Sequence, residues 1–290
     1  MAAQAPGTAA PGHPPGDPPA ESVRRAPDPA LRPYVHRLAG YAEHPPVPLR
    51  RREVPSGSVV VIINLGAPLR VLDPEEPGRG ARALRSFAAG LHQRYVVTET
   101  CGPSRGVQVD LTPVGARLLF GVPMDGLANR VVDLADLLGA EAATLAERLA
   151  AAPDWEGRLA AVERYLAGRL AAAPPPNAGV LWAWRRLRET DGRAAIGGLA
   201  AELGWSRKHL VAQFRREVGL PPKTLARILR FDRARRLLAV PGTMSDAEVA
   251  CACGYYDQAH LIRDVRAFAG CTPAEFRRRQ LPGEHGIAAG

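Results

Sequence analysis

One pattern that occurs twice in residues 196–279 constrains the fold of this chain more than any other feature. Each copy has a short apolar helix, a glycine, an aromatic residue and a second helix that precedes a Gly-x-x-Pro segment. Gly204 and Gly254 lie 50 residues apart, whereas Pro222 and Pro273 lie 51 apart, so the second copy carries one additional residue. Because internal repetition fixes an architecture before any single element is assigned, the pattern predicts two copies of one helical unit.

Each copy is typical of a helix-turn-helix. A glycine adopts positive φ at little cost, so Gly204 and Gly254 suit the tight turn after the first helix. Ser206 or Asp257 can then N-cap the second helix. On that second helix, apolar residues four apart are expected to face the core, and Arg, Gln and His side chains face outward, as reading of the major groove requires. The apolar pairs are Leu210 with Phe214 and Leu261 with Val265.

A strongly helical stretch, residues 224–238, separates the two copies. Its apolar residues follow helical spacing and arginines lie mostly between them. A rigid helix here would fix the separation of the two DNA-reading units. If they lie roughly 34 Å apart, about one turn of DNA, both can enter the same face of the duplex.

With these features combined, residues 180–280 resemble the DNA-binding domain of AraC/XylS-type bacterial transcription regulators. The additional residue in the second turn is also typical of that family. The resemblance implies an all-α domain of two helix-turn-helix subdomains linked by a long helix, and a role as a sequence-specific regulator, of which activation is one form. The matching segments are 196–200, 204–210, 219–223, 230–238, 250–255, 257–260 and 270–276.

The second helix of each unit carries the candidate DNA contacts. We expect its outward side chains to read bases, while arginines and helix N-termini around it neutralise phosphates. The alternative for each residue is a solvated side chain or a phosphate contact. The predicted base-reading residues are Arg207, Lys208, Gln213, Gln258, His260 and Arg263, and the predicted phosphate-binding residues are Ser206, Arg216, Arg227, Arg230, Arg266, Arg277 and Arg278.

The net charge of +9 lies entirely in the repeat region. Residues 181–280 hold 19 Arg and Lys against 10 Asp and Glu, which leaves 19 of each sign in the rest of the chain. Such segregation is the electrostatic footprint of a protein that binds a phosphate backbone. A solvated basic face is the alternative, since arginine is abundant in a chain this rich in Ala, Gly and Pro.

Composition divides the remaining residues. The Ala/Pro/Gly-rich residues 1–29 predict a disordered tail, 171–179 a Pro-rich linker and 281–290 a flexible tail. Between them, residues 30–170 predict an α+β domain in which a small antiparallel β unit at 50–111 precedes helices. The predicted strands are 59–65, 85–91, 94–100 and 106–111, and the predicted helices are 112–121, 134–138, 142–150 and 155–170.

This N-terminal region resembles an uncharacterised sensor-type domain that precedes AraC-type domains. The resemblance implies a sensing or dimerising role without naming a ligand. It is carried by segments 54–57, 64–66, 107–113, 115–116 and 119–124.

Other kinds of site find little support in the sequence. Four cysteines without a Cys-x-x-Cys pair indicate reduced thiols, and neither a signal peptide nor a membrane span is visible. His36, His44 and His92 lack metal-ligand spacing, and no base accompanies Cys101 as a nucleophile. We therefore predict a cytoplasmic, nucleoid-associated protein that is not an enzyme and has no catalytic residue, metal, cofactor or membrane partner.

Double-stranded promoter DNA and RNA polymerase are the predicted partners, and a small-molecule effector and a homodimer are left open. Two other classes also stay open at this point. A non-specific nucleic-acid-binding protein would lose binding to competitor DNA equally at all sites. An N-terminal enzyme fused to a DNA-binding domain would show turnover or a bound metal.

Overall fold

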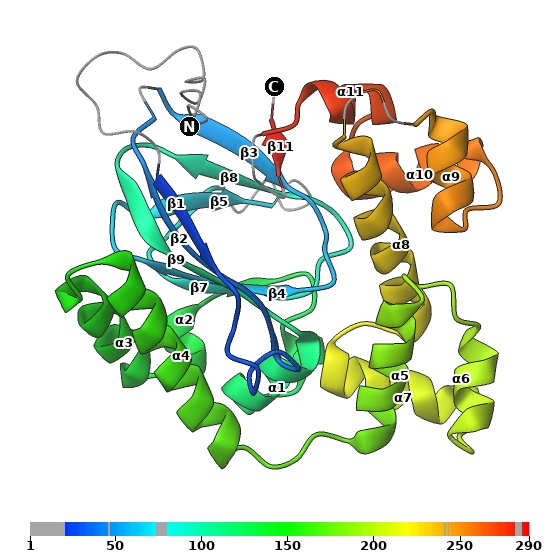
Figure 1. Cartoon of the computed structure of the whole chain (residues 1–290), viewed down its shortest axis with the longest axis horizontal. Coiled ribbons are helices and arrows are strands. Elements are labelled where there is room, and N and C mark those ends of the chain that lie inside the picture. Colours follow the sequence, from blue (N-terminus) through cyan, green and yellow to red (C-terminus); the bar gives the residue numbers. More distant parts are fainter. Residues whose placement is uncertain are drawn as a thin grey trace, which may run out of the picture.

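The computed structural model describes residues 21–45, 47–73, 80–240, 242, 244–281 and 286–289. A β-rich N-terminal domain lies beside an all-helical C-terminal domain (Figure 1). The predicted order, an α+β domain followed by an all-α domain, is confirmed. One cluster of buried apolar residues extends from the sheets into the helices of the C-terminal domain.

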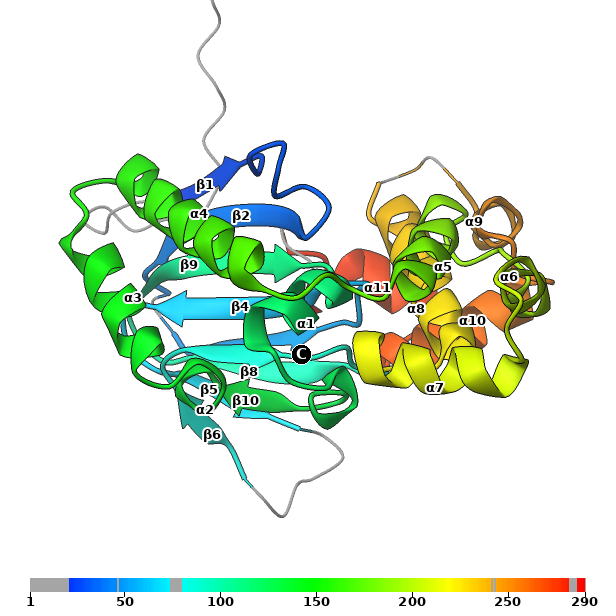
Figure 2. The ribbon, with the colours of Figure 1, turned by 90° about the horizontal axis from the view of Figure 1, so that it is seen from below.

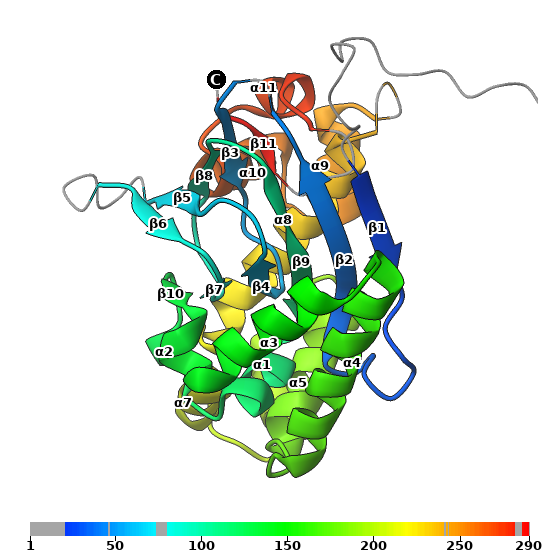
Figure 3. The ribbon, with the colours of Figure 1, turned by 90° about the vertical axis from the view of Figure 1, so that its left-hand side faces the viewer.

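Among the described residues, the strands form two antiparallel sheets (Figure 3). Residues of both sheets line a cavity between them. The first sheet has the order β1 (Glu21–Arg25), β2 (Val35–Glu43), β9 (Ser104–Leu111), β4 (Val59–Asn64), β7 (Phe87–Ala89) and β10 (Val131–Asp133). The second has the order β11 (Ile287–Ala288), β3 (Leu49–Glu53), β8 (Val96–Thr100), β5 (Leu69–Leu72) and β6 (Arg82–Leu84).

The four predicted strands correspond to β4, β7, β8 and β9, but the predicted β unit was too small. Strand β3 was missed because its sequence, LRRRE, lacks the apolar residues that mark a strand. Residues 101–103 join β8 of one sheet to β9 of the other.

Both predicted tails were partly wrong. Residues 21–25 form β1, which pairs with β2 from Glu21 with Ala42 to Arg25 with Leu38. Near the C-terminus, β11 pairs with the edge of β3 through Ile287 and Arg52. Local composition carries no signal for pairing with a distant strand, which explains both errors. The rest of the predicted N-terminal tail, residues 1–20, lies outside the described residues.

Helices cover the outer face of the six-stranded sheet (Figure 2). A Cβ on Gly40 of β2 would lie 2.3 Å from Cε3 of Trp155, whereas its neighbours Ala39 and Tyr41 line the cavity on the opposite face. Thr112 N-caps the first of these helices. The helices are α1 (Pro113–Phe120), the 3-10 helix η2 (Met124–Gly126), α2 (Leu134–Leu138), α3 (Ala140–Ala151) and α4 (Trp155–Ala172).

The C-terminal domain begins earlier than predicted. Helix α4 ends at Ala172 and Asn177 already caps the next helix, so the predicted linker 171–179 is shorter by residues at both ends. None of the helices in the described part of the chain is long and apolar enough to cross a membrane. The C-terminal helices are α5 (Ala178–Glu189), α6 (Ile196–Glu202), α7 (Arg207–Val218), α8 (Pro222–Leu238), α9 (Asp246–Cys253), α10 (Gln258–Ala269) and α11 (Pro273–Arg278).

Candidate nucleic-acid interface

The two sequence repeats form two similar helical units. We call α6 with α7 the first head and α9 with α10 the second head; α8 joins them. Gly204 and Gly254 adopt φ values of 65° and 72°, so the predicted left-handed turns are present. The predicted core positions are fully buried in both heads, namely Leu210, Phe214, Leu261 and Val265.

Both recognition helices, α7 and α10, begin with a side-chain cap. The Ser206 hydroxyl accepts a hydrogen bond from the backbone N–H of His209 (3.1 Å), and Asp257 Oδ1 accepts one from that of His260 (2.6 Å). The predicted N-caps are thus present. Ser206, which we also predicted to contact phosphate, therefore has a structural role as well.

An aromatic residue packs edge-on against a histidine at the start of each recognition helix. The ring centroids of Trp205 and His209 are 4.7 Å apart, and those of Tyr255 and His260 are 5.1 Å apart. The additional residue of the second copy is Tyr256, whose side chain points away and is 93% exposed. His209 and Tyr256 were not among the predicted residues, although alignment of the two copies would have revealed both.

Most predicted base-reading side chains are accessible. Arg207 and Lys208 are exposed in the first turn of α7, and Gln258 and Arg263 are exposed on α10. The remaining two are half-buried, and one of them, His260, packs its ring edge-on against that of Tyr255. All six residues lie on the recognition helices, and their contacts with DNA stay a prediction. The half-buried residues are Gln213 and His260.

The predicted phosphate-binding arginines fall into two groups. Arg227 forms a 2.6 Å ion pair with Asp264, Arg277 forms one with Asp246, and Arg230 lies 5.8 Å over the Tyr255 ring. These three arginines connect helices of the domain to one another, in addition to any contact with phosphate. The exposed members of the set are Arg216, Arg266 and Arg278.

The N-terminal domain holds the C-terminal end of each recognition helix. A Cβ on Gly219, which caps α7, would lie 2.8 Å from the carbonyl oxygen of Met124 in η2. At the end of α10, Arg52 Nη1 donates to the carbonyls of Ala269 (3.2 Å) and Gly270 (3.0 Å). Each helix has 12 residues, so its N-terminal end lies about 18 Å away from that contact.

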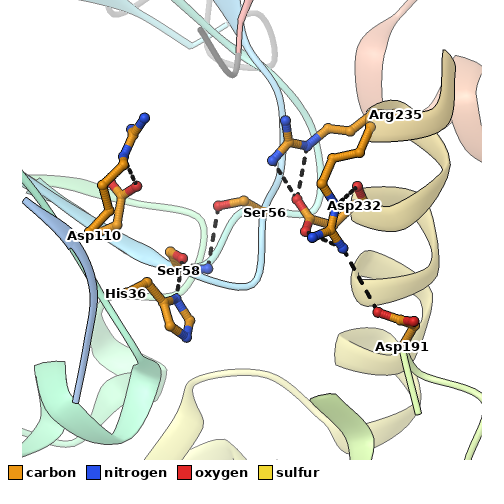
Figure 4. Close-up of polar contacts among 9 residues, drawn as sticks. His36, Ser56, Ser58, Asp110, Asp191, Asp232 and Arg235 are labelled. Carbon is orange, nitrogen blue, oxygen red and sulfur yellow. Dashed lines mark hydrogen bonds and ion pairs between the residues drawn. The ribbon is translucent and has the colours of Figure 1, made fainter. Parts of the chain in front are cut away.

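A polar cluster occupies the boundary between the domains (Figure 4). His36 of β2 shares a 2.8 Å hydrogen bond with Ser58 and stacks on Trp184 of α5, with the ring centroids 6.1 Å apart. Burial, together with the nearby Arg188 guanidinium, lowers the pKa of His36 to about 4. The imidazole is therefore neutral at pH 7. On the α8 side, Asp232 accepts a 2.8 Å hydrogen bond from Arg235.

The cavity between the sheets has a volume of about 210 Å³. Part of its lining is apolar, including Val60, Ile62, Val71, Phe87 and Val96. This cavity was not predicted, although polar residues alternate along three of its strands: Arg51 and Glu53, Thr98 and Thr100, and Gln108 and Asp110.

Two arginines that line the cavity are paired with carboxylates that also line it. Arg37 Nε lies 2.8 Å from Asp110 Oδ2, and Arg51 Nη2 lies 2.8 Å from Glu43 Oε2. Burial raises the pKa of the Glu53 carboxyl, with Arg51 opposing part of the shift. No group of three or more His, Cys, Asp or Glu side chains within the described residues could hold a metal ion.

Two domain families match the chain. Residues 199–279 match a family described as "Helix-turn-helix domain", and residues 23–133 match one described as "Domain of unknown function (DUF6597)". No curated protein matches the chain.

Three solved structures illustrate its similarity to known folds. ToxT from Vibrio cholerae with a bound unsaturated fatty acid is 9% identical, with a TM-score of 0.49, and the match covers 90% of this chain and 99% of that one. A DNA-binding transcriptional dual regulator from Escherichia coli K-12 is 27% identical over 37% of this chain and 95% of that one, with a TM-score of 0.32. A probable AraC family transcriptional regulator from Rhodopseudomonas palustris is also 27% identical, over 37% of this chain and 100% of that one, with a TM-score of 0.33.

The motifs of residues 180–280 and the two helix-turn-helix heads agree with the family match. Residues 199–279 are a helix-turn-helix domain of the AraC type, joined to an N-terminal domain of a family whose function is unknown.

Proposed function

We propose that this chain is a one-component transcription regulator that reads promoter DNA with both heads. The observation that carries the proposal is the pair of heads on one linking helix, each with exposed basic or polar side chains on its recognition helix. The charge of residues 181–280 supports it, because counterion release from DNA favours a locally basic protein. Each head would place one recognition helix in the major groove.

The N-terminal domain is the proposed regulatory part, and its cavity is the proposed effector site. A cavity of about 150 Å³ holds benzene, so one of about 210 Å³ suits a ligand of roughly eight non-hydrogen atoms. Arg37 and Arg51 are each neutralised by a carboxylate, so a charged ligand would have to break an existing ion pair. We therefore propose an uncharged ligand with an apolar body and a few hydroxyl or amide groups.

The partners follow from this role. RNA polymerase is the proposed protein partner, and a regulator of this kind would act at the bacterial nucleoid, in the cytoplasm. A homodimer is compatible with the proposal but is not required by it, because one chain already carries two heads. The proposed activity is binding and not catalysis.

Genomic footprinting with the purified full-length protein, in the presence of competitor DNA, tests the proposal. We expect a small set of sites that share a bipartite motif, with half-sites about 10 base pairs apart. Diffuse binding that weakens with salt at every sequence would refute promoter recognition and favour a non-specific nucleic-acid-binding protein.

A further inference from the structure

We infer that residues 51–58, which we call the coupling segment, transmit the state of the cavity to the DNA-binding domain. The segment comprises the end of β3 and the loop to β4. The inference rests on the proposed function for its biological meaning, since it names the route by which an effector would alter DNA binding. This one short segment contacts the cavity on one side and both α8 and α10 on the other.

The coupling segment contacts the cavity with most of its residues and the DNA-binding domain with two others. In β3, Arg51 and Glu53 line the cavity, whereas Arg52 between them faces away, which is the two-residue period of a β-strand. In the loop, Val54, Pro55, Ser56 and Ser58 also line the cavity, whereas Gly57 does not. A shift of the backbone on the cavity side therefore also moves the groups on the other side.

On the far side, Arg52 holds the end of the second recognition helix. Its guanidinium donates to the carbonyls of Ala269 and Gly270 and lies 4.8 Å over the ring of Tyr95. The last carbonyls of a helix carry partial negative charge, which a cation stabilises. Displacement of Arg52 would thus release or reorient the C-terminal end of α10.

The loop of the coupling segment rests directly on the linking helix. A Cβ on Gly57 would lie 2.7 Å from Cδ2 of Leu229 in α8, so the loop backbone packs against that side chain without a gap. Close-packed contacts of this kind transmit small displacements instead of absorbing them. Because α8 joins the two heads, a shift here changes how they are placed relative to each other.

A third contact joins the same segment to α5. Ser58 lines the cavity and shares its hydrogen bond with His36 (Figure 4). The ring of His36 stacks on Trp184 of α5. Ser58 also donates its backbone N–H to the hydroxyl of Ser56, another cavity residue. Movement of this turn would therefore also displace α5, the helix that precedes the first head.

Contacts inside the cavity would start the movement of the coupling segment when a ligand binds. Arg51 is paired with Glu43, and Glu53 accepts a 3.0 Å hydrogen bond from Thr98. A ligand that enters the cavity must rearrange these side chains or press against them. Because β3 is hydrogen-bonded on both sides, to β8 and to β11, the strand responds as a unit.

Hydrogen–deuterium exchange on the full-length protein without DNA tests the inference. Ala89→Phe places a bulky group in the cavity from β7, which belongs to the opposite sheet. The substitution leaves the sequence of the coupling segment unchanged. We expect exchange rates to change by at least roughly threefold at residues 51–58, around Leu229 and at residues 266–270. If Ala89→Phe does not fold, Val131→Phe fills the cavity from β10 instead.

Two further variants make the outcome specific. Ala83→Phe adds the same group at an exposed position of β6 that does not line the cavity, and it should leave α8 and α10 unchanged. In the Arg52→Ala background, the cavity-filling substitution should still alter exchange around Leu229 but no longer at residues 266–270. Altered exchange at 51–58 with both α8 and α10 unaffected in the native background would overturn the inference.

This experiment separates the two proposals. If footprinting finds no specific sites but exchange changes at α8 and α10, the coupling stands and the function must be revised. If specific sites exist but the exchange does not change, promoter recognition stands and the coupling segment is refuted.

Discussion

The two heads share one motif but are attached to the N-terminal domain in different ways. The first head is held by helix packing, with α7 against α1 and η2 and an ion pair of 3.7 Å between Arg117 and Glu217. The second head is held by Arg52 from β3, and the chain that follows it returns to the same strand as β11. The N-terminal domain therefore contacts each head through a separate element, so each contact can be altered independently.

The heads also differ in their internal stabilisation. In the second head, Asp264 is almost fully buried and pairs with Arg227 of α8, and Ser245 and Glu248 form a capping box at the start of α9. At the equivalent start of α6, Ala195 provides no side-chain cap. The second head is therefore stabilised by polar contacts where the first relies on apolar packing.

The largest effect should come from the buried ion pair. Arg227→Ala leaves the buried Asp264 carboxylate without its partner and should lower the free energy of unfolding by about 3 kcal/mol. Urea denaturation of the full chain measures the change. Arg266→Ala, at an exposed position of the same head, is the control and should cost less than about 0.5 kcal/mol. Equal effects of the two substitutions would contradict a stabilising role for the pair.

The heads should each read one half-site. Arg263→Ala should weaken binding by roughly 1–3 kcal/mol and relax the base preference at the half-site of the second head only. Arg207→Ala should do the same at the other half-site. Binding selections with randomised half-sites measure both changes. Uniform weakening on every sequence would instead identify the mutated arginine as a phosphate contact.

His36, at the interface between the domains, should make the stability of the protein depend on pH. Unfolded His36 titrates near 6.5 and the folded residue near 4, so between these values the unfolded chain binds the additional proton. The stabilising contribution is complete above about pH 6.5 and is lost as the pH falls toward 4.

Between pH 7 and pH 5 the loss from His36 should be about 2 kcal/mol, measured by urea denaturation at each pH. Because burial also lowers the pKa of His92, the test is the difference between the native chain and His36→Gln. Identical pH profiles for the two proteins would contradict the assignment.

The smallest expected effect concerns the caps. Ser245→Ala should destabilise the second head by about 1 kcal/mol, because it removes the hydroxyl that accepts from the backbone N–H of Glu248. Ala195→Ser, in extended backbone geometry, should stabilise the first head by up to about 1 kcal/mol. Thermal unfolding measures both changes. If capping explains the difference between the heads, the two substitutions should bring the stabilities of the heads closer together; unchanged unfolding of both variants would contradict this explanation.

The heads were predictable because their signals are local. Apolar residues four apart, a glycine at positive φ and a capping side chain act within a few residues of one another, so Leu210, Gly204 and Ser206 could be placed from the sequence. The sheets were harder to predict because their partners are distant. The arginines of β3 look like a surface run, yet Arg51 points into a cavity and Arg52 holds a helix.

The class of the C-terminal domain, the positions of its two heads and the basic charge of residues 181–280 can be read from local sequence. How the heads are held depends on contacts between segments that are distant in the chain. The contact between Arg52 and Ala289 spans 237 residues, and the packing of Gly57 on Leu229 depends on both domains at once. Such contacts arise from the pairing of strands and the closure of two cores, which depend on shape complementarity and leave no periodic pattern in the chain.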